Sequence, residues 1–387
     1  MSDRHQPQGS YPTRLRLSST PIPSAASPMH PRIPVLDGHN DTLTQIRNAT
    51  GEDVRTFLER SDRGHIDLPR AVEGGLAAGF FAVFTASPDY DPMLEDRIDD
   101  DGSPIPGGWS VALPPPLDRR IALDYVLDVF SDLFRMLAAS DGRVVLVRGV
   151  EDLARCRDGD ALGVILHIEG AEAIDADLAA LDVLHAAGLR SLGPVWSRPT
   201  IFGSGVPFDF PRSPDTGDGL TDAGRRLVAR CNELGILVDL SHLNEKGFWD
   251  VAEASDAPLV ATHSNAHALC PSPRNLTDEQ LDAVADSGGL VGVNFHRGFL
   301  REDGRRDLET SRAEIVRHAV YMVERMGAAH VALGSDFDGA TMPSDLADVT
   351  VLPTLLEELS AAGLSDADVR AIAWDNWIRV LEDTWLA

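Results

Sequence analysis

The sequence has few of the residues on which several kinds of protein chemistry depend. It contains a single lysine, Lys246, so a lysine Schiff base or a modified lysine that bridges metals would have to use that one residue. Its three cysteines, Cys156, Cys231 and Cys270, are odd in number, far apart and without a CxxC pair. Neither a disulfide framework nor a cysteine-based zinc site is therefore predicted.

The sequence also lacks the features of a nucleic-acid-binding or membrane protein. The formal net charge is -27, whereas binding to nucleic acid or to an anionic membrane requires Lys and Arg side chains that neutralise phosphates. No stretch of 18 apolar residues occurs, and the N-terminus has no apolar core typical of a secretory signal. We expect a cytoplasmic protein with no nucleic-acid or membrane partner.

The order of apolar segments predicts the fold class. Residues 1–31, rich in Pro, Ser and Arg, are expected to form a disordered tail, and residues 32–387 a single domain. Helix-like segments such as 118–139 and 277–288 alternate with eight short β-rich runs, at 33–38, 79–86, 161–170, 188–196, 235–242, 257–264, 288–295 and 330–339. This alternation predicts a (β/α)8 barrel of the α/β class, with an open doubly wound sheet as the alternative. No GxGxxG or GxxxxGK[ST] motif follows a strand, so nucleotide binding finds no support.

Two long segments interrupt this alternation. Residues 87–117 and 197–219 are rich in Gly, Pro and acidic residues. We expect them to be loops at the top of the barrel that shape a substrate mouth, although insertions without a role would have the same composition.

Polar residues of metal-binding type follow five of the predicted strands. In a (β/α)8 barrel the chemistry lies at the C-terminal ends of the strands. His39 and Asp41 are two residues apart, so in an extended strand they would share one face. A single pair of this kind more often has a structural role. Here, however, residues of metal-binding type also follow four further strands, namely Glu169, His242, His263, Asp336 and Asp338.

These residue types predict a site for two metal ions. The His39 and Asp41 pair would form one cluster and His242 with His263 the other, and the carboxylate of Glu169 could bridge the two metals. Imidazole and carboxylate ligands suit zinc, with manganese or iron as alternatives. Asp336 would then be free for proton transfer. His167 is expected to lie in the core or to support the ligands from behind, whereas His267 and His296 are expected to have surface or hydrogen-bonding roles.

Eight motifs resemble the membrane dipeptidase (renal dipeptidase) family of zinc metallopeptidases, over nearly the whole chain after the tail. They are DGHND at 37–41, HIDLPRAVEGGLAAGFF at 65–81, IEGAEAI at 168–174, DLSHLNEKGFWDV at 239–251, THSNAHALCPSPRNLTDEQ at 262–280, GVNF at 292–295, GSDFDG at 334–339 and DNWIRVLEDTW at 375–385. The resemblance implies a (β/α)8 metallohydrolase with two zinc ions per chain and suggests a homodimer.

The resemblance also implies roles for single residues. His39 and Asp41 would hold one zinc ion, His242 and His263 the other, and Glu169 would bridge them. Arg274 matches the arginine that holds the free carboxylate of the substrate, and Asp336 matches the residue that handles the proton. Asp338 is then expected to be structural, for instance as a cap of the following turn.

The chain departs from the family pattern at the end of the fourth strand. Where the family commonly has a histidine that contacts the substrate, Trp196 stands in this sequence. Its indole N–H can donate a hydrogen bond but cannot take up a proton. Either another group, such as Arg198, supplies this role, or the substrate differs from the usual dipeptides.

Three functions remain open from the sequence. The first is hydrolysis of a dipeptide with a free C-terminal carboxylate by a metal-bridging hydroxide, with Asp336 as the proton carrier. The second is hydrolysis of a lactam, lactone or cyclic amide at the same metals, which Trp196 and the long acidic segments keep open. The third, a binding protein without turnover, is disfavoured because every expected ligand is present.

Overall fold

The computed structural model describes residues 33–87, 94–98, 104–306 and 309–385. Residues 33–387 cluster as one compact unit. The tail expected at residues 1–31 lies outside the described residues.

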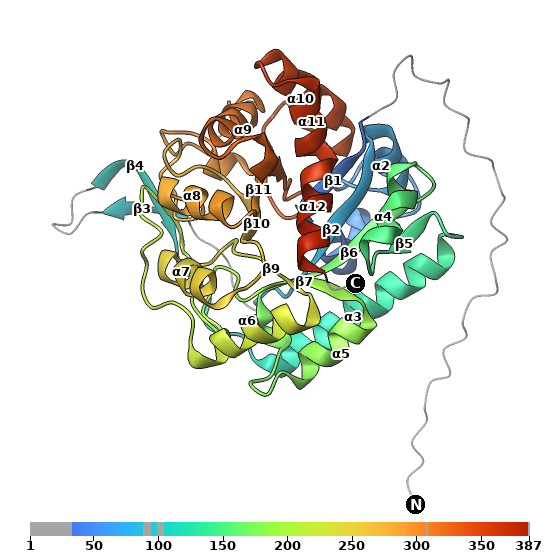
Figure 1. The fold of residues 1–387 in the computed structure, drawn as a ribbon, viewed down its shortest axis with the longest axis horizontal. Coiled ribbons are helices and arrows are strands. Elements are labelled where there is room, and N and C mark those ends of the chain that lie inside the picture. The colour runs from blue at the N-terminus through green and yellow to red at the C-terminus, as the bar shows by residue number, and fades with distance from the viewer. Residues whose placement is uncertain (1–32, 88–93, 99–103, 307–308, 386–387) are drawn as a thin grey trace, which may run out of the picture. The chain divides into compact units, whose positions relative to one another are not determined.

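Eight parallel strands form the centre of the molecule (Figure 1). Around the barrel they are β1 (Val35–Asn40), β2 (Leu76–Phe84), β6 (Leu162–Glu169), β7 (Leu189–Gly193), β9 (Leu237–Val238), β10 (Val260–Ser264), β11 (Leu290–Val293) and β12 (Val331–Leu333). Asp37 pairs with Leu333 between the first and last strands, and a parallel bridge from Asp239 to Val260 joins β9 to β10. The predicted (β/α)8 barrel is therefore confirmed, and the open sheet is wrong.

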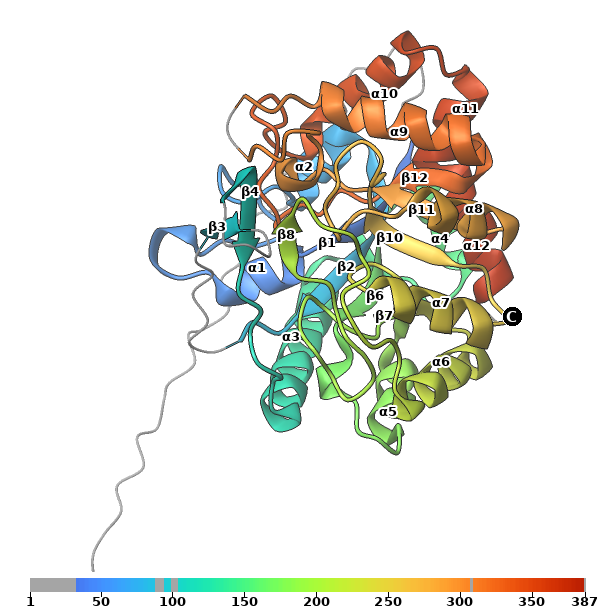
Figure 2. The ribbon, with the colours of Figure 1, turned by 90° about the vertical axis from the view of Figure 1, so that its left-hand side faces the viewer.

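Helices surround these strands in both views (Figures 1 and 2). They are α1 (Thr42–Asn48), α2 (Leu68–Gly74), α3 (Arg119–Ala139), α4 (Val150–Arg157), α5 (Ala179–Ala187), α6 (Asp222–Leu234), α7 (Glu245–Ala254), α8 (Asp278–Asp286), α9 (Ala313–Met326), α10 (Leu352–Ala361), α11 (Asp366–Arg370) and α12 (Asn376–Thr384). Short 3-10 or π-helical turns are η1 (Gly51–Asp53), η2 (Ala171–Ala173), η3 (Arg297–Phe299), η4 (Ala328–His330), η5 (Val349–Val351) and η6 (Ala371–Asp375).

The two helices singled out in the sequence show why these segments are helical. The first is α3, which is capped by Asp118: the Asp118 side chain accepts from the Arg120 amide. The helix buries residues spaced three or four apart, such as Val126, Val129 and Phe130. The second is α8, which begins with a capping box between Thr277 and Gln280.

Apolar packing fills one end of the barrel and leaves the other end for chemistry. A buried cluster combines inward residues of most strands with Trp374, Trp377, Val380 and Leu381 from η6 and α12. Trp377 donates to the Leu333 carbonyl, and its ring lies 4.8 Å from that of Phe80. Because α12 covers this end, a substrate has to enter at the other one, where the strands terminate.

The long segments between strands contain more structure than expected. Residues predicted as loops form a three-stranded antiparallel sheet of β3 (Leu94–Ile98), β4 (Pro104–Val111) and β8 (Phe208–Phe210), visible beside the barrel in Figure 2. A further strand, β5 (Val144–Leu146), pairs with β6 outside the ring. Residues 88–93 and 99–103 of the first segment lie outside the described residues.

Candidate metal centre and cavity

All five predicted metal ligands meet at the C-terminal end of the barrel. His39 lies in β1 and Glu169 ends β6, and His263 lies in β10. Asp41 is the residue directly after β1, and His242 follows the short strand β9. Each is at most 6% exposed, so all five side chains are buried.

Glu169 stands between two groups of candidate ligands. Its Oε1 lies 2.9 Å from His242 Nε2 and 3.4 Å from His263 Nε2. Its Oε2 lies 3.8 Å from His39 Nε2, which is itself 3.3 Å from Asp41 Oδ2. Both groups have their ligand atoms close enough together to hold one ion, and they share the Glu169 carboxylate.

His39 and Asp41 approach each other by a route that the sequence did not indicate. The expected strand alternation is wrong at this point, because Asp41 is not extended (φ −101°, ψ 22°) and precedes α1. Asn40 does point elsewhere, since its side chain donates to the Phe80 carbonyl. His39 Nδ1 and Asp41 Oδ1 are buried and have no hydrogen-bond partner among the described residues.

Hydrogen bonds behind His263 orient its ring toward Glu169. Asp239 accepts from Thr262 Oγ1 at 2.6 Å, and this hydroxyl lies 2.9 Å from His263 Nδ1. Since the hydroxyl proton goes to Asp239, the hydroxyl accepts from His263 Nδ1–H, and this assignment leaves a lone pair on Nε2.

His242 is held in a similar way, and its Nε2 faces the same point. Its Nδ1 lies 2.8 Å from Ser197 Oγ, and its Nε2 lies 3.2 Å from His263 Nε2. With both rings protonated at Nδ1 and Glu169 ionised, two imidazole lone pairs and one oxygen of Glu169 converge without a proton between them. Such acceptors repel one another unless a cation lies among them, so the donor set fits a metal ion.

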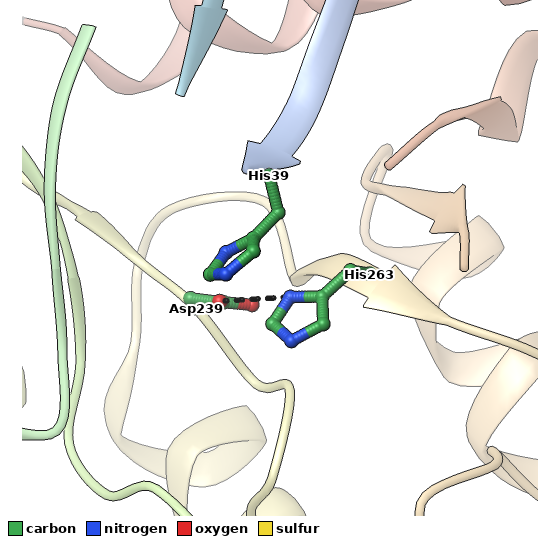
Figure 3. A group of neighbouring side chains, drawn as sticks. All are labelled: His39, Asp239 and His263. Carbon is green, nitrogen blue, oxygen red and sulfur yellow. Dashed lines mark ion pairs between the residues drawn. The ribbon is translucent and has the colours of Figure 1, made fainter. Parts of the chain in front are cut away.

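Asp239 is a functional residue that the sequence analysis missed. Figure 3 shows it beside His39 and His263, with its Oδ2 3.9 Å from His263 Nδ1. It also accepts from the amides of Ser241 and Thr262. Its position in the DLSH motif, three residues before His242, is the one signal in the sequence that could have identified it.

The protonation preferences of the cluster support the same conclusion. Burial raises the pKa of Glu169 well above its usual value, and burial together with the charge of Arg274 holds the pKa of His242 well below its own. Burial also acts to lower the pKa of His39, but the nearby charges of Glu169 and Asp41 outweigh it and raise that pKa to about 10. Burial thus favours the neutral imidazole that a metal ligand requires at His242, and a cation would in addition favour the ionised carboxylate of Glu169 that burial alone disfavours.

Asp336 lies beside this cluster in a strained turn. Burial raises its pKa to about 6, and Asn294 Nδ2 donates to its Oδ2 at 3.0 Å. Asp336, Asp338 and His242 all have positive φ, which is uncommon for residues other than glycine and costs energy. Gly339 completes the turn, because a Cβ at this position would come within 2.0 Å of Asp41 Oδ2.

Asp338 has a structural place rather than one among the ligands. It accepts from Thr42 Oγ1 at 2.8 Å and pairs with Arg55 at 3.2 Å. Its Oδ1 accepts from the His65 amide. It thus joins the turn after β12 to α1 and to the segment before α2, and these bonds differ from the local cap that we expected.

A cavity of about 510 Å³ opens from the candidate metal centre. Arg274 lines it and is buried, and its Nη2 donates to the His263 carbonyl at 3.1 Å. Among the described residues it has no carboxylate partner, and its Nε has no hydrogen-bond partner. Burial lowers the pKa of Arg274, and the charges of Asp336 and Glu169 oppose that shift.

Aromatic residues form the outer walls of the cavity. Trp196 lines it, with its ring 5.3 Å from Phe208 and 5.9 Å from His242. Trp109 and Val111 of β4 and Phe208 of β8 line it too, so parts of both long segments do shape its mouth. Arg198 is not among the lining residues. It pairs with Glu172 and donates to the Thr85 carbonyl.

The three remaining histidines occupy different surroundings. His167 is buried, with Nδ1 2.9 Å from Ser191 Oγ and its ring against His39, which is a supporting position. His267 Nε2 contacts the Arg212 carbonyl. His296 contacts the Thr341 carbonyl but also lines the cavity, which the sequence did not indicate.

Comparison with known proteins identifies the family. Residues 24–386 match the family model described as membrane dipeptidase, peptidase family M19. The chain belongs to the membrane dipeptidase family. The resemblance seen in the motifs is thereby confirmed, and the protein is a hydrolase of a metallopeptidase family.

Relatives with known structures support this assignment. A crystal structure of a metallopeptidase from Rhodobacter sphaeroides, liganded with a phosphinate mimic of the dipeptide L-Ala-D-Ala, is 49% identical, covers 92% of this chain and 100% of its own, and has a TM-score of 0.84. A dipeptidase of family M19, dipeptidase AC, is 50% identical, also covers 92% of this chain and 100% of its own, and has a TM-score of 0.83. An uncharacterized protein of Klebsiella pneumoniae from the pqqA 5' region is 51% identical over 263 residues, which are 68% of this chain and 97% of that protein.

No helix among the described residues is long and apolar enough to cross a membrane. The expected cytoplasmic location and the expected homodimer stay predictions.

Proposed function

We propose that the protein is a zinc-dependent dipeptidase that hydrolyses the peptide bond of short peptides, above all dipeptides, with a free C-terminal carboxylate. The observation that carries this proposal is the arrangement of one cavity. It has a candidate binuclear metal centre at its base and, in its wall, a buried arginine that has no carboxylate partner among the described residues. The dipeptide mimic named for the Rhodobacter sphaeroides relative supports the same substrate class.

The donor set at the base of the cavity would hold two ions. His39 and Asp41 would bind one zinc ion, His242 and His263 the other, and Glu169 would bind both. When bound, the two ions would acidify a water molecule and polarise the scissile carbonyl group. Asp239 and Ser197 hold the two histidine rings with Nε2 directed at this point.

Arg274 would select and orient the substrate. Its guanidinium group can bind a carboxylate through two parallel hydrogen bonds, and its burial strengthens this contact. Because it lies on the same cavity as Glu169 and Asp336, a carboxylate held there places a nearby peptide bond toward the base of the cavity. We therefore expect a preference for a terminal carboxylate over an internal position in a long chain.

Asp336 would carry the proton. Its raised pKa, about 6, suits a group that accepts a proton from the attacking water and then donates it to the leaving amine near neutral pH. Asn294 fixes Oδ2, so we assign the proton transfer to Oδ1.

The test combines metal content with activity on one purified sample. We expect about two zinc ions per chain by elemental analysis and hydrolysis of Ala-Ala and related dipeptides. Asp336→Asn should keep the metal and reduce kcat by about 100-fold or more. The control Asp62→Asn, at an exposed surface carboxylate, should change neither.

Two results would contradict the proposal. A protein that binds less than one metal ion per chain would lack the proposed centre. A protein with two ions that hydrolyses a lactam, lactone or cyclic amide but no dipeptide would have the centre and another substrate class, and Trp196 would then be the first residue to examine.

A further inference from the structure

A second arginine, Arg306, lines the same cavity as Arg274. It follows η3 in the segment before α9 and is partly buried. Within the part of the chain that the structure describes, Arg306 forms no hydrogen bond and no ion pair. The neighbouring Arg305, in contrast, forms an ion pair in which its Nη2 lies 3.3 Å from Glu309 Oε2. An unpaired cation in the wall of a substrate cavity is unexpected in a chain with 61 acidic residues against 34 basic ones.

The side chain of Arg306 is nevertheless held in place. Its guanidinium carbon lies 4.5 Å from the centre of the Trp109 ring, a cation–π contact. The Trp109 indole donates to the Gly304 carbonyl at 2.9 Å, which fixes the segment that carries Arg306. Stacking occupies one face of the guanidinium group and leaves its N–H donors at the edge free for a ligand.

Arg306 lies near the end of the cavity where Arg274 is found. A Cβ on Gly298 would be 3.4 Å from Arg306 Nε and 3.0 Å from His296 Nε2, so one backbone position touches both side chains. The His296 ring packs on Phe299 at 4.6 Å, and the guanidinium group of Arg274 lies 5.4 Å from that same ring. His296 and Phe299 therefore separate two guanidinium groups that both reach the cavity.

We propose that Arg306 binds the side-chain carboxylate of an acidic residue, aspartate or glutamate, at the C-terminal position of the dipeptide. This inference rests on the proposed function, because it takes the main-chain carboxylate of that residue to be held by Arg274. The two carboxylates of a C-terminal aspartate or glutamate then match the two arginines that line the cavity. Arg306 determines specificity and has no part in the chemical step.

The test is the ratio of kcat/KM for Ala-Asp to that for Ala-Asn, a neutral substrate of nearly the same shape, with the second residue in both the L and the D form. We expect a ratio of at least about ten for the better stereoisomer, because a charge-assisted hydrogen bond in a partly buried site is worth about that factor. Arg306→Gln should reduce this ratio to about one, and Arg306→Lys should keep part of it. Using a ratio cancels any general loss of folded enzyme.

The matched control is Arg305→Gln, which removes the same charge from the adjacent residue outside the cavity lining and should leave the ratio unchanged. If Arg305→Gln lowered the ratio as much as Arg306→Gln, a general attraction of anions would replace the proposed contact. A preference for Asp-Ala over Asn-Ala, with none for Ala-Asp, would overturn the placement at the C-terminal residue.

Failure of this inference can be told apart from failure of the proposed function. Hydrolysis of Ala-Ala with equal values for Ala-Asp and Ala-Asn would overturn the role of Arg306 alone. A protein that hydrolyses none of these dipeptides would overturn both.

Discussion

The two ends of the cavity are built in different ways. We call the base of the cavity the floor, consisting of His39, Asp41, Glu169, His242 and His263, and its outer wall the rim, consisting of Trp109, Phe208, Phe299 and Arg306. The floor residues lie on strands of one parallel sheet or within a few residues of their ends, whereas the rim residues lie on inserted segments between the strands. The floor is rich in carboxylates and imidazoles, and the rim combines aromatic rings with a cation.

Under the proposed function, this difference separates chemistry from selectivity. The floor is fixed by the strand ladder and by buried hydrogen bonds, which suits groups that must hold metal ions in one geometry. The rim is built from inserted segments whose sequence can vary without disturbing the barrel. Such segments can determine which substrate is bound while the reaction stays the same. Substitutions in the floor should therefore affect every substrate, and those nearer the rim should affect some substrates more than others.

The largest effect is expected for Glu169→Gln in the floor. The substitution removes the charge shared by both groups of ligands, so metal content should fall and kcat/KM should drop by more than about 100-fold on all dipeptides. Elemental analysis and kinetics on the same sample measure both. Glu172→Gln is the matched control, because Glu172 pairs with Arg198 instead, and it should keep its metal. Full metal content in Glu169→Gln would contradict the bridging position.

The next largest effect is expected for Arg274→Gln. Arg274 lies between the floor and the rim. Loss of the carboxylate contact should lower kcat/KM for Ala-Ala by about 10- to 100-fold, mainly through KM. Ala-Ala amide, which has no terminal carboxylate, should lose far less. An equal loss on both substrates would show that Arg274 acts on the metal centre and not on the substrate.

A smaller effect is expected for Asp239→Asn, behind the floor. The amide would replace one acceptor oxygen by a donor, so Thr262 and His263 would lose the hydrogen bonds that leave a lone pair on His263 Nε2. We expect zinc affinity to fall by about tenfold, measured by competition with a chelator. Thr262→Ser keeps the connecting hydroxyl and serves as the control. Unchanged affinity in Asp239→Asn would contradict this orienting role.

The last effect is expected on stability and not on activity, at a histidine that connects floor and rim. His318 Nδ1 accepts from the Ala266 amide just after β10, and its Nε2 contacts the Leu300 carbonyl next to η3. Burial lowers its pKa from 6.5 to about 4, so the unfolded chain binds the proton more readily between these values. The contribution of His318 to the free energy of unfolding is therefore complete above pH 6.5 and is lost as the pH falls toward 4. It amounts to about 3 kcal/mol.

The variant His318→Gln tests this contribution. Denaturant unfolding between pH 4 and 7, with chelator in every sample, should give a shallower pH dependence for the variant than for the natural chain. Parallel curves would show that His318 stays protonated or plays no part.

The sequence indicated those site residues that stand singly at the end of a predicted strand. Glu169, His242 and His263 each follow a separate apolar run, and the parallel arrangement of those runs brings them together. Sequence reasoning failed for residues whose role depends on contacts with another element of the fold. Asp239 looked like an ordinary strand residue, and His296 looked like a surface histidine, because their contacts with Thr262 and with the cavity join distant parts of the chain.

The inserted segments show the same limit. Residues 87–117 read as Gly- and Pro-rich loops, yet Pro104–Val111 forms a strand because residues of β8, about a hundred positions later, supply its hydrogen bonds. Trp196 was noted for its position in the sequence, but its neighbours Phe84 and Phe208 were not predicted. Local composition carries no information about such a partner.

The sequence by itself determined the barrel, the family and the floor, because periodic apolar runs specify parallel strands and parallel strands place their ends at one edge. Only the tertiary structure decided the rim. The contact of Arg306 with Trp109 and the shared cavity with Arg274 arise from segments far apart in the chain, whose meeting depends on packing and not on local pattern.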